Sequence, residues 1–306
     1  MRYGIDIGGT KIAGAALAPD GREAAAARLP NPKGDYEGAV ANVAAVVRAL
    51  VAKTGVAPTR LGVCVSGNVR PATGSIRLGT AWWLRDRPFR DDIAAATGLP
   101  VRLANDADCF ALSEATDGAG QGARSVFGVI LGTGVGGGFV LDGRLVAGRL
   151  GVAGEIGHMP MPGADEAERA AGPCSCGKFG CAETLLSGGA LSADYARAAG
   201  IARDAAPDAR ALAEMAADGD AEAEAALARY ESRLARLCGV LVNVVEPDVI
   251  VLGGGVSNVA RLYDAVAPQL PAHVFGGACE TRILRNVHGD SSGVRGAARL
   301  WEGETG

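Results

Sequence analysis

The chain carries an internal repeat that constrains its fold more than any other feature of its sequence. The segment GIDIGGTKIAGAAL at 4–17 and the segment GVILGTGVGGGFVL at 128–141 align without a gap, 124 residues apart, so that Gly8 falls on Gly132. Both segments place apolar and small residues on either side of a glycine turn, which is the pattern of a β-hairpin. A repeat of this length predicts two related halves, each opening on a strand, a glycine turn and a second strand.

Glycine is the amino acid whose abundance departs most from that of an ordinary globular protein. The chain has 46 glycines among 306 residues, about twice the usual ~7%. They fall in clusters without a period, which excludes collagen and indicates functional turns. Hydrophobic residues make up 48% and charged residues 21% of the chain, so a disordered chain is excluded and one or two packed domains are expected.

Charge and hydropathy exclude several classes of partner. The 30 basic residues stand against 34 acidic ones, a net charge of −4, and no basic block invites nucleic acid or an anionic membrane surface. No apolar run reaches the ~18 residues of a membrane span. The opening residues, MRYGIDIGGT, have the pattern of a strand and not of a signal peptide. We therefore expect a cytoplasmic protein.

Periodicity predicts an α/β chain in both halves. Apolar residues recur at spacings of three and four where helices are expected, and short apolar runs bounded by turn residues mark strands. Asp220 is the expected N-cap of the longest helix. The main predicted elements are strands at 2–7, 12–18, 23–29, 61–65, 101–104 and 248–255, and helices at 36–53, 91–97, 220–245, 258–270 and 293–302, with one more that follows Asp106 and runs through Glu114.

Three glycine turns have the character of phosphate sites. Glycine lets a phosphate approach unpaired main-chain N–H groups closely, Thr10 and Lys11 add a hydroxyl and a cation, and Asp6 offers a carboxylate to Mg²⁺ through water. A tight hairpin with a solvated lysine is the alternative for the first turn taken alone. Neither the Walker pattern nor G-x-G-x-x-G in a strand–turn–helix setting is present, so a nucleotide needs a different fold. The expected nucleotide residues are Asp6, Gly8, Gly9, Thr10, Lys11, Gly132, Thr133, Gly134, Gly136, Gly253, Gly254 and Gly255.

Asn105 and Asp106 stand between a predicted strand and a predicted helix. An N-cap pair is the ordinary interpretation of Asn-Asp in this place. Phosphoryl transfer to an alcohol, however, needs a carboxylate that accepts the hydroxyl proton and little other covalent chemistry from the protein. Beside two phosphate-type turns, Asp106 becomes the candidate base, and Asn105 becomes the residue that orients the acceptor.

A cluster of cysteines and one histidine has the spacing of a metal site. The histidine is followed by three cysteines in an H-x15-C-x-C-x4-C pattern, with glycines that supply the turns. Three thiolates and an imidazole form a closed tetrahedral set for Zn²⁺, which predicts a structural ion; three reduced thiols in a glycine-rich loop are the alternative. The ion would hold the loop that bears Glu155 and Glu183, whose carboxylates suit sugar hydroxyls. The expected ligands are His158, Cys174, Cys176 and Cys181.

Taken together, these motifs resemble those of the ROK family, named for repressors, open reading frames and sugar kinases. The resemblance covers nearly the whole chain, and the motifs are specific in combination. Within the family, the segments at 87–93 and 273–301 resemble bacterial fructokinases and mannokinases, and N-acetylglucosamine kinases come next. The motifs that carry the resemblance are DIGGTK, GTGVGGG, Asn105-Asp106, EIGHM at 155–159, CSCGKFGCAE at 174–183 and VLGGG at 251–255.

The resemblance implies an α/β, two-domain actin/hexokinase-like (ribonuclease H-like) fold with an interdomain cleft that closes on a sugar and ATP with Mg²⁺. Many members are dimers, so a homodimer is expected. The resemblance also implies that Asp106 deprotonates the 6-hydroxyl of the sugar, and that His158 contacts the sugar while it ligates zinc. The residues expected at the sugar are Ser66, Gly67, Thr80, Asn105, Asp106, Glu155, His158 and Glu183.

Two departures from the family pattern bear on the choice of sugar. Thr80 stands where family kinases often carry asparagine, and threonine cannot make a bidentate amide contact; Ser66 stands where close relatives have proline. An indole of Trp82 or Trp83 that faced the site would exclude an N-acetyl group at C2, whereas packing of both rings into the core is the alternative. We therefore expect an ATP-dependent hexose 6-kinase that prefers fructose, or mannose, to N-acetylglucosamine.

The expected domains are 1–117 together with a C-terminal helix at 291–306, and a larger domain at 118–290 that carries the zinc loop. Three other functions stay open: an N-acetylglucosamine (N-acetylhexosamine) 6-kinase, a sugar-sensing regulator of the same family without its helix-turn-helix domain, and an inactive sugar-binding module. Because the chain opens on its first predicted strand, we do not expect such a DNA-binding domain. The intact Asp106 and phosphate turns favour an enzyme.

Overall fold

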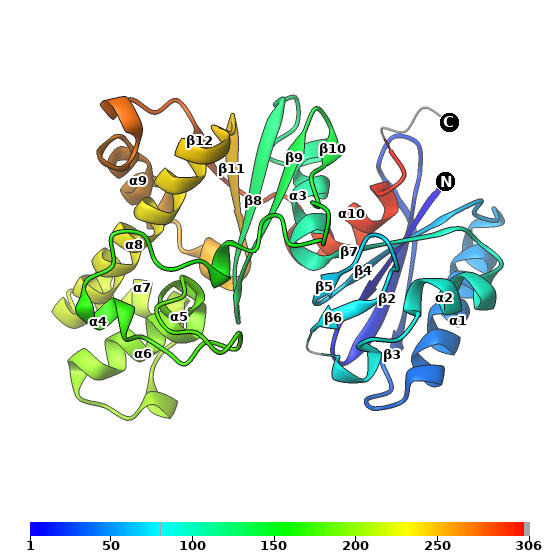
Figure 1. The fold of residues 1–306 in the computed structure, drawn as a ribbon, viewed down its shortest axis with the longest axis horizontal. Helices are drawn as coiled ribbons and strands as arrows, with labels where there is room; N and C mark the ends of the chain where they lie inside the picture. Colours follow the sequence, from blue (N-terminus) through cyan, green and yellow to red (C-terminus); the bar gives the residue numbers. More distant parts are fainter. Residues whose placement is uncertain (80, 303–306) are drawn as a thin grey trace. The chain divides into compact units, whose positions relative to one another are not determined.

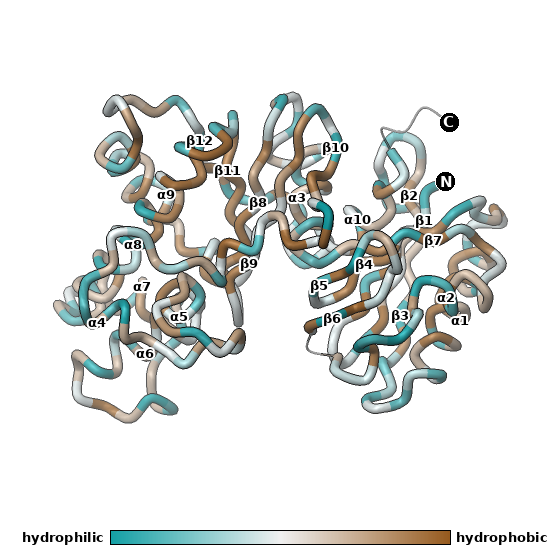
Figure 2. The backbone as a smooth tube through the Cα atoms, viewed as in Figure 1, coloured by the Kyte–Doolittle hydropathy of each residue, from teal (hydrophilic) through white to brown (hydrophobic). Residues whose placement is uncertain are grey.

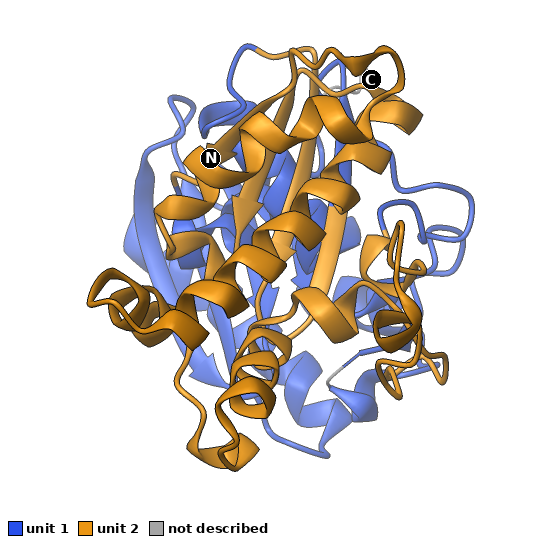
Figure 3. Cartoon of the chain, turned by 90° about the vertical axis from the view of Figure 1, so that its left-hand side faces the viewer, with its two compact units in different colours: residues 1–122, 138–154, 288–306 blue, residues 123–137, 155–287 orange. Residues whose placement is uncertain are grey.

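The computed structural model describes residues 1–79 and 81–302, so the expected sugar residue Thr80 lies outside the described part. The chain divides into two compact units (Figure 3). The first unit comprises 1–122, 138–154 and 288–306, and the second comprises 123–137 and 155–287. The domain limits expected from the sequence stay a prediction. The two units differ from them mainly in that 138–154 belongs with the N-terminal part.

The first unit is built on a five-stranded sheet with the strand order β3-β2-β1-β4-β7 (Figure 1). β2 runs antiparallel to β1 and to β3, whereas β4 runs parallel to β1 and to β7. The strands are β1 (Arg2–Ile7), β2 (Lys11–Leu17), β3 (Glu23–Pro30), β4 (Leu61–Val65) and β7 (Val101–Asn105), with a separate small pair, β5 (Asn68–Val69) and β6 (Ile76–Leu78).

Helices cover both faces of this sheet because its strands bury side chains on both. On one face, Tyr3, Ile5 and Ile7 belong to an apolar core that also takes in buried residues of α1 and α2. On the opposite face, Cys64 and Ala104 pack with residues of α3 and α10. The helices of this unit are α1 (Tyr36–Thr54), α2 (Phe89–Thr97), α3 (Asp106–Asp117) and α10 (Ser292–Arg299), with 3-10 turns η1 (Trp82–Leu84) and η7 (Gly289–Ser291).

Glycines let α10 lie directly on the main chain of the sheet. A Cβ atom on Gly4 would come within 2.1 Å of the carbonyl oxygen of Val294, and one on Gly62 within 1.7 Å of that of Ala297. Both approaches are far below the ordinary van der Waals contact of about 3.5–4.0 Å. Only a hydrogen atom fits at these positions of β1 and β4, so the glycines are required by packing.

We predict that Gly62→Ala lowers the free energy of unfolding by about 3 kcal/mol or more, because the added methyl group must displace a helix backbone and not a flexible side chain. Chemical denaturation measures the change. Gly189→Ala is the matched control: a Cβ there meets no described atom within 4 Å, and alanine in a helix gains up to about 1 kcal/mol over glycine. Equal stabilities of the two variants would contradict this account of the packing.

The second sheet repeats the order of the first, β10-β9-β8-β11-β12 (Figure 1). β8 and β12 run parallel to β11, and β10 runs antiparallel to β9. β11 is apolar along its length and fully buried (Figure 2). The strands are β8 (Ser125–Leu131), β9 (Val135–Leu141), β10 (Arg144–Leu145), β11 (Val249–Gly253) and β12 (Arg282–Arg285).

The helices of the second unit include the long helix predicted at 220–245. Asp220 accepts a hydrogen bond from the main-chain N–H of Ala223 at 2.9 Å, which confirms the expected N-cap. No helix within residues 1–79 and 81–302 is long and apolar enough to cross a bilayer. The helices are α4 (Glu166–Arg169), α5 (Glu183–Leu186), α6 (Gly188–Ala199), α7 (Ala209–Ala217), α8 (Ala221–Val245) and α9 (Arg261–Val266), with 3-10 turns η2 (Ile156–His158), η3 (Arg203–Ala205), η4 (Gly255–Asn258), η5 (Ala267–His273) and η6 (Phe275–Gly277).

The internal repeat corresponds to two hairpins in equivalent places of the two sheets. The segment at 4–17 contains the β1–β2 turn, and the segment at 128–141 contains the β8–β9 turn. Each hairpin is followed, in its sheet, by three further strands in the same spatial order: β3, β4 and β7 in the first sheet, and β10, β11 and β12 in the second. The prediction of two related halves that open on a strand, a glycine turn and a strand is therefore confirmed.

Candidate active site

The carboxyl ends of β1, β4 and β7 meet at one edge of the first sheet. These three strands are parallel, and the register pairs Asp6 with Cys64 and Val65 with Asn105. The segments that follow them are the glycine turn at 8–11, the Ser66–Gly67 turn and the start of α3. Loops at the carboxyl edge of a parallel sheet are where α/β proteins bind ligands. The structure thus gathers the expected nucleotide turn, sugar turn and base of this unit at a single edge.

The turn between β1 and β2 leaves room beside its main chain. Gly8 donates its N–H to the carbonyl of Lys11 at 2.9 Å. A Cβ on Gly9 would meet no described atom within 4 Å, and the φ angle of Gly9 lies outside the left-handed region that favours glycine. Glycine at this position therefore has no packing role among the described residues, and the open space suits an approaching phosphate. Burial raises the pKa of Asp6, against the opposing effects of the Cys64 thiol and of Lys11.

Asn31 braces this turn, and sequence analysis missed it. Its side-chain amide donates to the carbonyl of Gly8 at 2.7 Å, and its main-chain N–H donates to the carbonyl of Thr10 at 3.0 Å. The side chain is buried, and its Oδ1 has no hydrogen-bond partner within the described chain. A buried acceptor of this kind needs a donor from water or ligand. The only sequence signal was a lone asparagine just after β3, which is also an ordinary loop residue.

The sequence left open whether Asn105 and Asp106 cap a helix or act on a substrate, and the two residues differ in this respect. Asn105 is buried and is the N-cap of α3, because its side chain accepts from the N–H of Asp108. Asp106 opens the first turn of the helix, is exposed, and also accepts from the N–H of Ala107 at 3.0 Å. The capping interpretation is confirmed for Asn105. Asp106 has the accessibility that a base requires.

The sugar-side turn is shaped by packing as well as by any ligand. Gly67 has a φ of +132°, and a Cβ there would lie 1.8 Å from the carbonyl oxygen of Leu78. The two tryptophans that follow point to different environments. Trp83 is 7% exposed and belongs to the apolar core, whereas Trp82 is 57% exposed and contacts the edge of Trp83 with 5.9 Å between ring centroids. The sequence left open whether an indole of Trp82 or Trp83 faces the sugar or packs into the core; for Trp83 the structure shows packing into the core.

Two glycine turns of the second unit contact each other. The carbonyl of Gly132 accepts the N–H of Gly188, at the start of α6, at 2.8 Å. Gly254 has a φ of +80°, and a Cβ there would lie 2.5 Å from the carbonyl oxygen of Leu131. Gly254 is therefore required by its backbone, whereas a Cβ on Gly255 would meet nothing within 4 Å among the described atoms.

Two further expected nucleotide residues differ in their setting. Thr133 is exposed in the turn between β8 and β9. Gly136 lies inside β9 and not in the turn, which ends at Gly134. The run of seven residues from 132 to 138 was expected to form one glycine loop, but pairing with a neighbouring strand extends β9 through its small residues.

Glu183 ties the cysteine loop to the glycine turn. Its Oε2 accepts from the N–H of Val135 at 3.1 Å, and its Oε1 accepts from the hydroxyl of Ser175 at 3.3 Å and faces the thiol of Cys174 at 3.7 Å. A Cβ on Gly134 would come within 2.5 Å of the same Oε2. Gly134 thus lies against the end of the Glu183 side chain, and the carboxylate expected at the sugar also contacts the turn expected at the phosphates.

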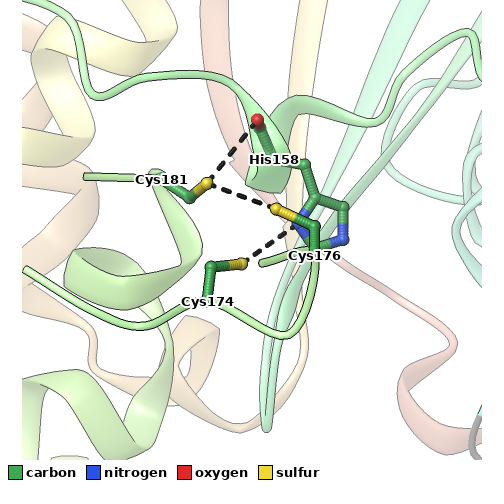
Figure 4. A group of neighbouring side chains, drawn as sticks. All are labelled: His158, Cys174, Cys176 and Cys181. Atoms are coloured by element: carbon green, nitrogen blue, oxygen red, sulfur yellow. Dashed lines mark hydrogen bonds between the residues drawn. The ribbon is translucent and has the colours of Figure 1, made fainter. Parts of the chain in front are cut away.

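The histidine and three cysteines converge in space as the sequence spacing predicts (Figure 4). Their candidate ligand atoms all lie within 4.8 Å of one another. The Sγ atoms of Cys176 and Cys181 are 3.6 Å apart, and the Sγ of Cys174 is 3.3 Å from Nδ1 of His158. A tetrahedral zinc ion with Zn–S bonds of about 2.3 Å separates its sulfur ligands by about 3.8 Å. The donor set and its spacing therefore fit Zn²⁺.

Several ionisable side chains lie close together in this part of the second unit and shift one another's pKa. Burial, together with the neighbouring thiols of Cys176 and Cys174, raises the pKa of Cys181 to about 12. Burial also raises the pKa of Glu155, which His158 opposes and Glu183 reinforces. Glu155 is half-buried just before η2. The electrostatic coupling indicates that Glu155, His158 and Glu183 lie together, as expected for one binding surface.

A buried ion-pair cluster fixes the segment before the cysteine loop to α8. Glu168, in the short helix α4, accepts from Arg233 and from Arg236, each at 2.8 Å. Arg236 also donates to the carbonyls of Pro162 and Gly163, both at 2.9 Å. Burial alone would raise the pKa of Glu168, but hydrogen bonds and charge from the two arginines outweigh it and hold the pKa at about 2.

We predict that Glu168→Gln lowers the free energy of unfolding by about 3 kcal/mol at pH 7, from the depressed pKa. The folded state binds the proton less tightly than the unfolded state, so the contribution is fully present above about pH 4.5 and is lost as the pH falls toward about 2. Denaturation of parent and variant across this range measures the difference. Glu166→Gln, at an exposed position of the same helix, is the control, and a pH-independent difference would refute the assignment.

The comparisons with known proteins agree with this fold and site. The model of the ROK family matches residues 2–304, and the chain belongs to that family. Among curated proteins it is similar to the N-acetyl-D-glucosamine kinase of Vibrio parahaemolyticus, with 37% identity over 98% of this chain and 99% of that protein. The corresponding protein of Salmonella paratyphi C is 38% identical, with the same coverage of both chains.

Solved structures place the chain in the actin/hexokinase-like fold. A ROK hexokinase from Thermus thermophilus superimposes with a TM-score of 0.85 and 32% identity over 98% of this chain and 96% of that one. A ROK family glucokinase from Streptomyces griseus, solved in complex with glucose and AMPPNP, superimposes with a TM-score of 0.78 and 28% identity over 98% of each chain. The α/β fold class and the ROK family expected from the sequence are confirmed.

Proposed function

We propose that this protein is an ATP-dependent kinase that phosphorylates the 6-hydroxyl of N-acetyl-D-glucosamine. The observation that carries the proposal is the exposed Asp106 at the amino end of α3, on the same sheet edge as the open glycine turn at 8–11. The choice of sugar rests on relatives: curated proteins named N-acetyl-D-glucosamine kinase are 37–38% identical over nearly the whole chain. We therefore prefer N-acetyl-D-glucosamine to fructose as the proposed substrate.

Phosphoryl transfer from ATP to a sugar hydroxyl requires no covalent bond between the substrates and the protein. The Asp106 carboxylate accepts the proton of the sugar 6-hydroxyl as O6 forms a bond to the γ-phosphorus and the bond from that phosphorus to the β–γ bridging oxygen breaks, releasing ADP. The turn at 8–11 presents main-chain N–H groups and Lys11 to the phosphates. Mg²⁺, when bound, neutralises phosphate charge, and Asp6 would hold it through water. In the second unit, the carboxylates of Glu155 and Glu183 accept hydrogen bonds from sugar hydroxyls. His158, whose other ring nitrogen would hold the zinc ion, donates its ring N–H to a sugar hydroxyl.

The tryptophans no longer argue strongly for fructose. Exclusion of an N-acetyl group required an indole at the pocket wall, and Trp83 lies in the core instead. Trp82 is exposed and offers an apolar surface that also suits the methyl group of an acetamide. The expected homodimer and the expected cytoplasmic location stay predictions.

We predict that Asp106→Asn lowers kcat by about 10²–10⁴, which is the contribution of a positioned general base, while the KM values for sugar and ATP change little. Asparagine keeps the size and the helix-start position of the aspartate. A coupled assay for ADP measures turnover, with Asp204→Asn, exposed in η3, as the charge-matched control. Turnover within a few-fold of the parent would remove Asp106 from the mechanism.

The sugar is tested by the same assay across N-acetylglucosamine, glucose, mannose and fructose at saturating ATP. We expect the highest kcat/KM for N-acetylglucosamine, because a site that hydrogen-bonds a substituent discriminates against sugars that lack it. A higher kcat/KM for fructose would restore the first expectation and overturn the proposed sugar. Phosphorylation of none of these sugars would overturn the kinase assignment as well.

We also propose that His158, Cys174, Cys176 and Cys181 bind one structural Zn²⁺ per chain, supported by their convergence within 4.8 Å. A closed four-ligand site contributes folding free energy directly. Elemental analysis of protein purified without chelator should give one zinc per chain. Cys176→Ala should lose the metal and melt at a lower temperature. Cys279→Ala, outside the cluster, should keep the zinc content and the melting temperature of the parent. Parent protein without zinc would refute this site.

A further inference from the structure

A cavity of about 770 Å³ lies wholly within the first unit, and no function described above uses it. Its walls come from the turn after β5, from α2, from β7, from α3, from the segment at 143–151 and from residues 299–302, where α10 ends. Of the expected catalytic, sugar, nucleotide and metal residues that the structure describes, none is among its lining residues. Its volume is in the range that small-molecule sites occupy, about 300–1,000 Å³.

The cavity is rich in guanidinium groups although the chain as a whole is acidic. Five arginines and three carboxylates line it, in a chain of net charge −4. Two of the arginines are committed to carboxylates: Arg90 to Asp91 at 2.9 Å, and Arg299 to Glu302 at 3.2 Å. Lining of this composition favours an anionic ligand over a cation or an apolar one.

The remaining arginines differ in how they are held. Arg102 lies over the ring of Trp301, with 4.0 Å from its guanidinium carbon to the ring centroid, and donates to the carbonyl of Leu300 at 3.0 Å. Arg70 and Arg144 are exposed, and their side chains make no hydrogen bond or ion pair with the described residues. They flank the cavity from the β5 and β10 sides. Two unengaged guanidinium groups at one cavity match the bidentate hydrogen bonding of a phosphate group.

The floor of the cavity supplies main-chain polar groups. Residues 100–104 line it, and they include most of β7, which is the edge strand of the first sheet. An edge strand presents N–H and C=O groups that have no strand partner on its outer side. Such groups suit the hydroxyls of a polyol. The cavity thus combines anion-binding side chains at its rim with hydrogen-bonding main chain at its floor.

We propose that this cavity is a second, non-catalytic ligand site for a monosaccharide phosphate, with the phosphate group on Arg70 and Arg144 and the sugar against the edge of β7. The proposal goes beyond the kinase function and does not depend on it. A ligand of this class is also the chemical type of a sugar kinase product, so the site would let the protein respond to its own product or to a related phosphate.

Calorimetric titration tests the site without turnover. N-acetylglucosamine 6-phosphate and inorganic phosphate are titrated separately into the parent, into Arg70→Ala/Arg144→Ala, and into Arg28→Ala, which removes an exposed arginine of β3 that is not at the cavity. We expect the double variant to bind the sugar phosphate at least about ten-fold more weakly, because each charge-assisted hydrogen bond to phosphate contributes that much. Arg28→Ala should bind as the parent does.

The outcomes separate the parts of the proposal. Both substituted arginines are exposed, so melting temperatures of all three proteins should agree, which rules out a folding defect. Equal affinity of parent and double variant for the sugar phosphate would overturn the site. Inorganic phosphate that binds the cavity as tightly as the sugar phosphate would overturn the monosaccharide part of the proposal. Neither result would bear on the ADP assay that tests the kinase function.

Discussion

The contact between helix α10 and the strands β1 and β4 is the interaction on which the first unit depends. α10 comes from the far end of the chain, and it lies on the main chain of the sheet because Gly4 and Gly62 have no side chains. A helix seated this closely covers the face of the sheet that the apolar core of α1 and α2 leaves open. The parallel strands are thereby sandwiched, and their carboxyl ends, with Asp6 and Asn105, share one edge.

In the second unit, a single carboxylate has a comparable place. Glu183 touches the cysteine loop through Ser175 and Cys174 and the glycine turn through Val135. The residue expected at the sugar is therefore hydrogen-bonded to the turn expected at the phosphates. A structural metal at the cysteines would stiffen the sugar surface and the nucleotide surface of this unit together.

Much of the fold and of the candidate site followed from local sequence patterns. Each hairpin of the repeat, the cap of helix α8, the Asn105 cap and most of the cysteine–histidine motif involve residues that are close in sequence, so a linear pattern is sufficient to show them. The burial of Trp83 could not be predicted in this way, because a residue in a short 3-10 turn shows no periodic pattern of apolar residues. Its burial is decided by the core of α1 and α2, which lies elsewhere in the chain.

The sequence by itself determined which chemical groups this protein has: the proposed base Asp106, the glycine turns, the candidate zinc ligands and the motifs of the family to which the chain belongs. The tertiary structure alone decided which of those groups are accessible and what else they touch. Gly134 faces Glu183, Asn31 braces the first turn, and arginines more than 200 residues apart in the chain, Arg70 and Arg299, line one cavity. The physical reason is that burial and electrostatics depend on distance in space, and chain folding sets that distance independently of separation in sequence.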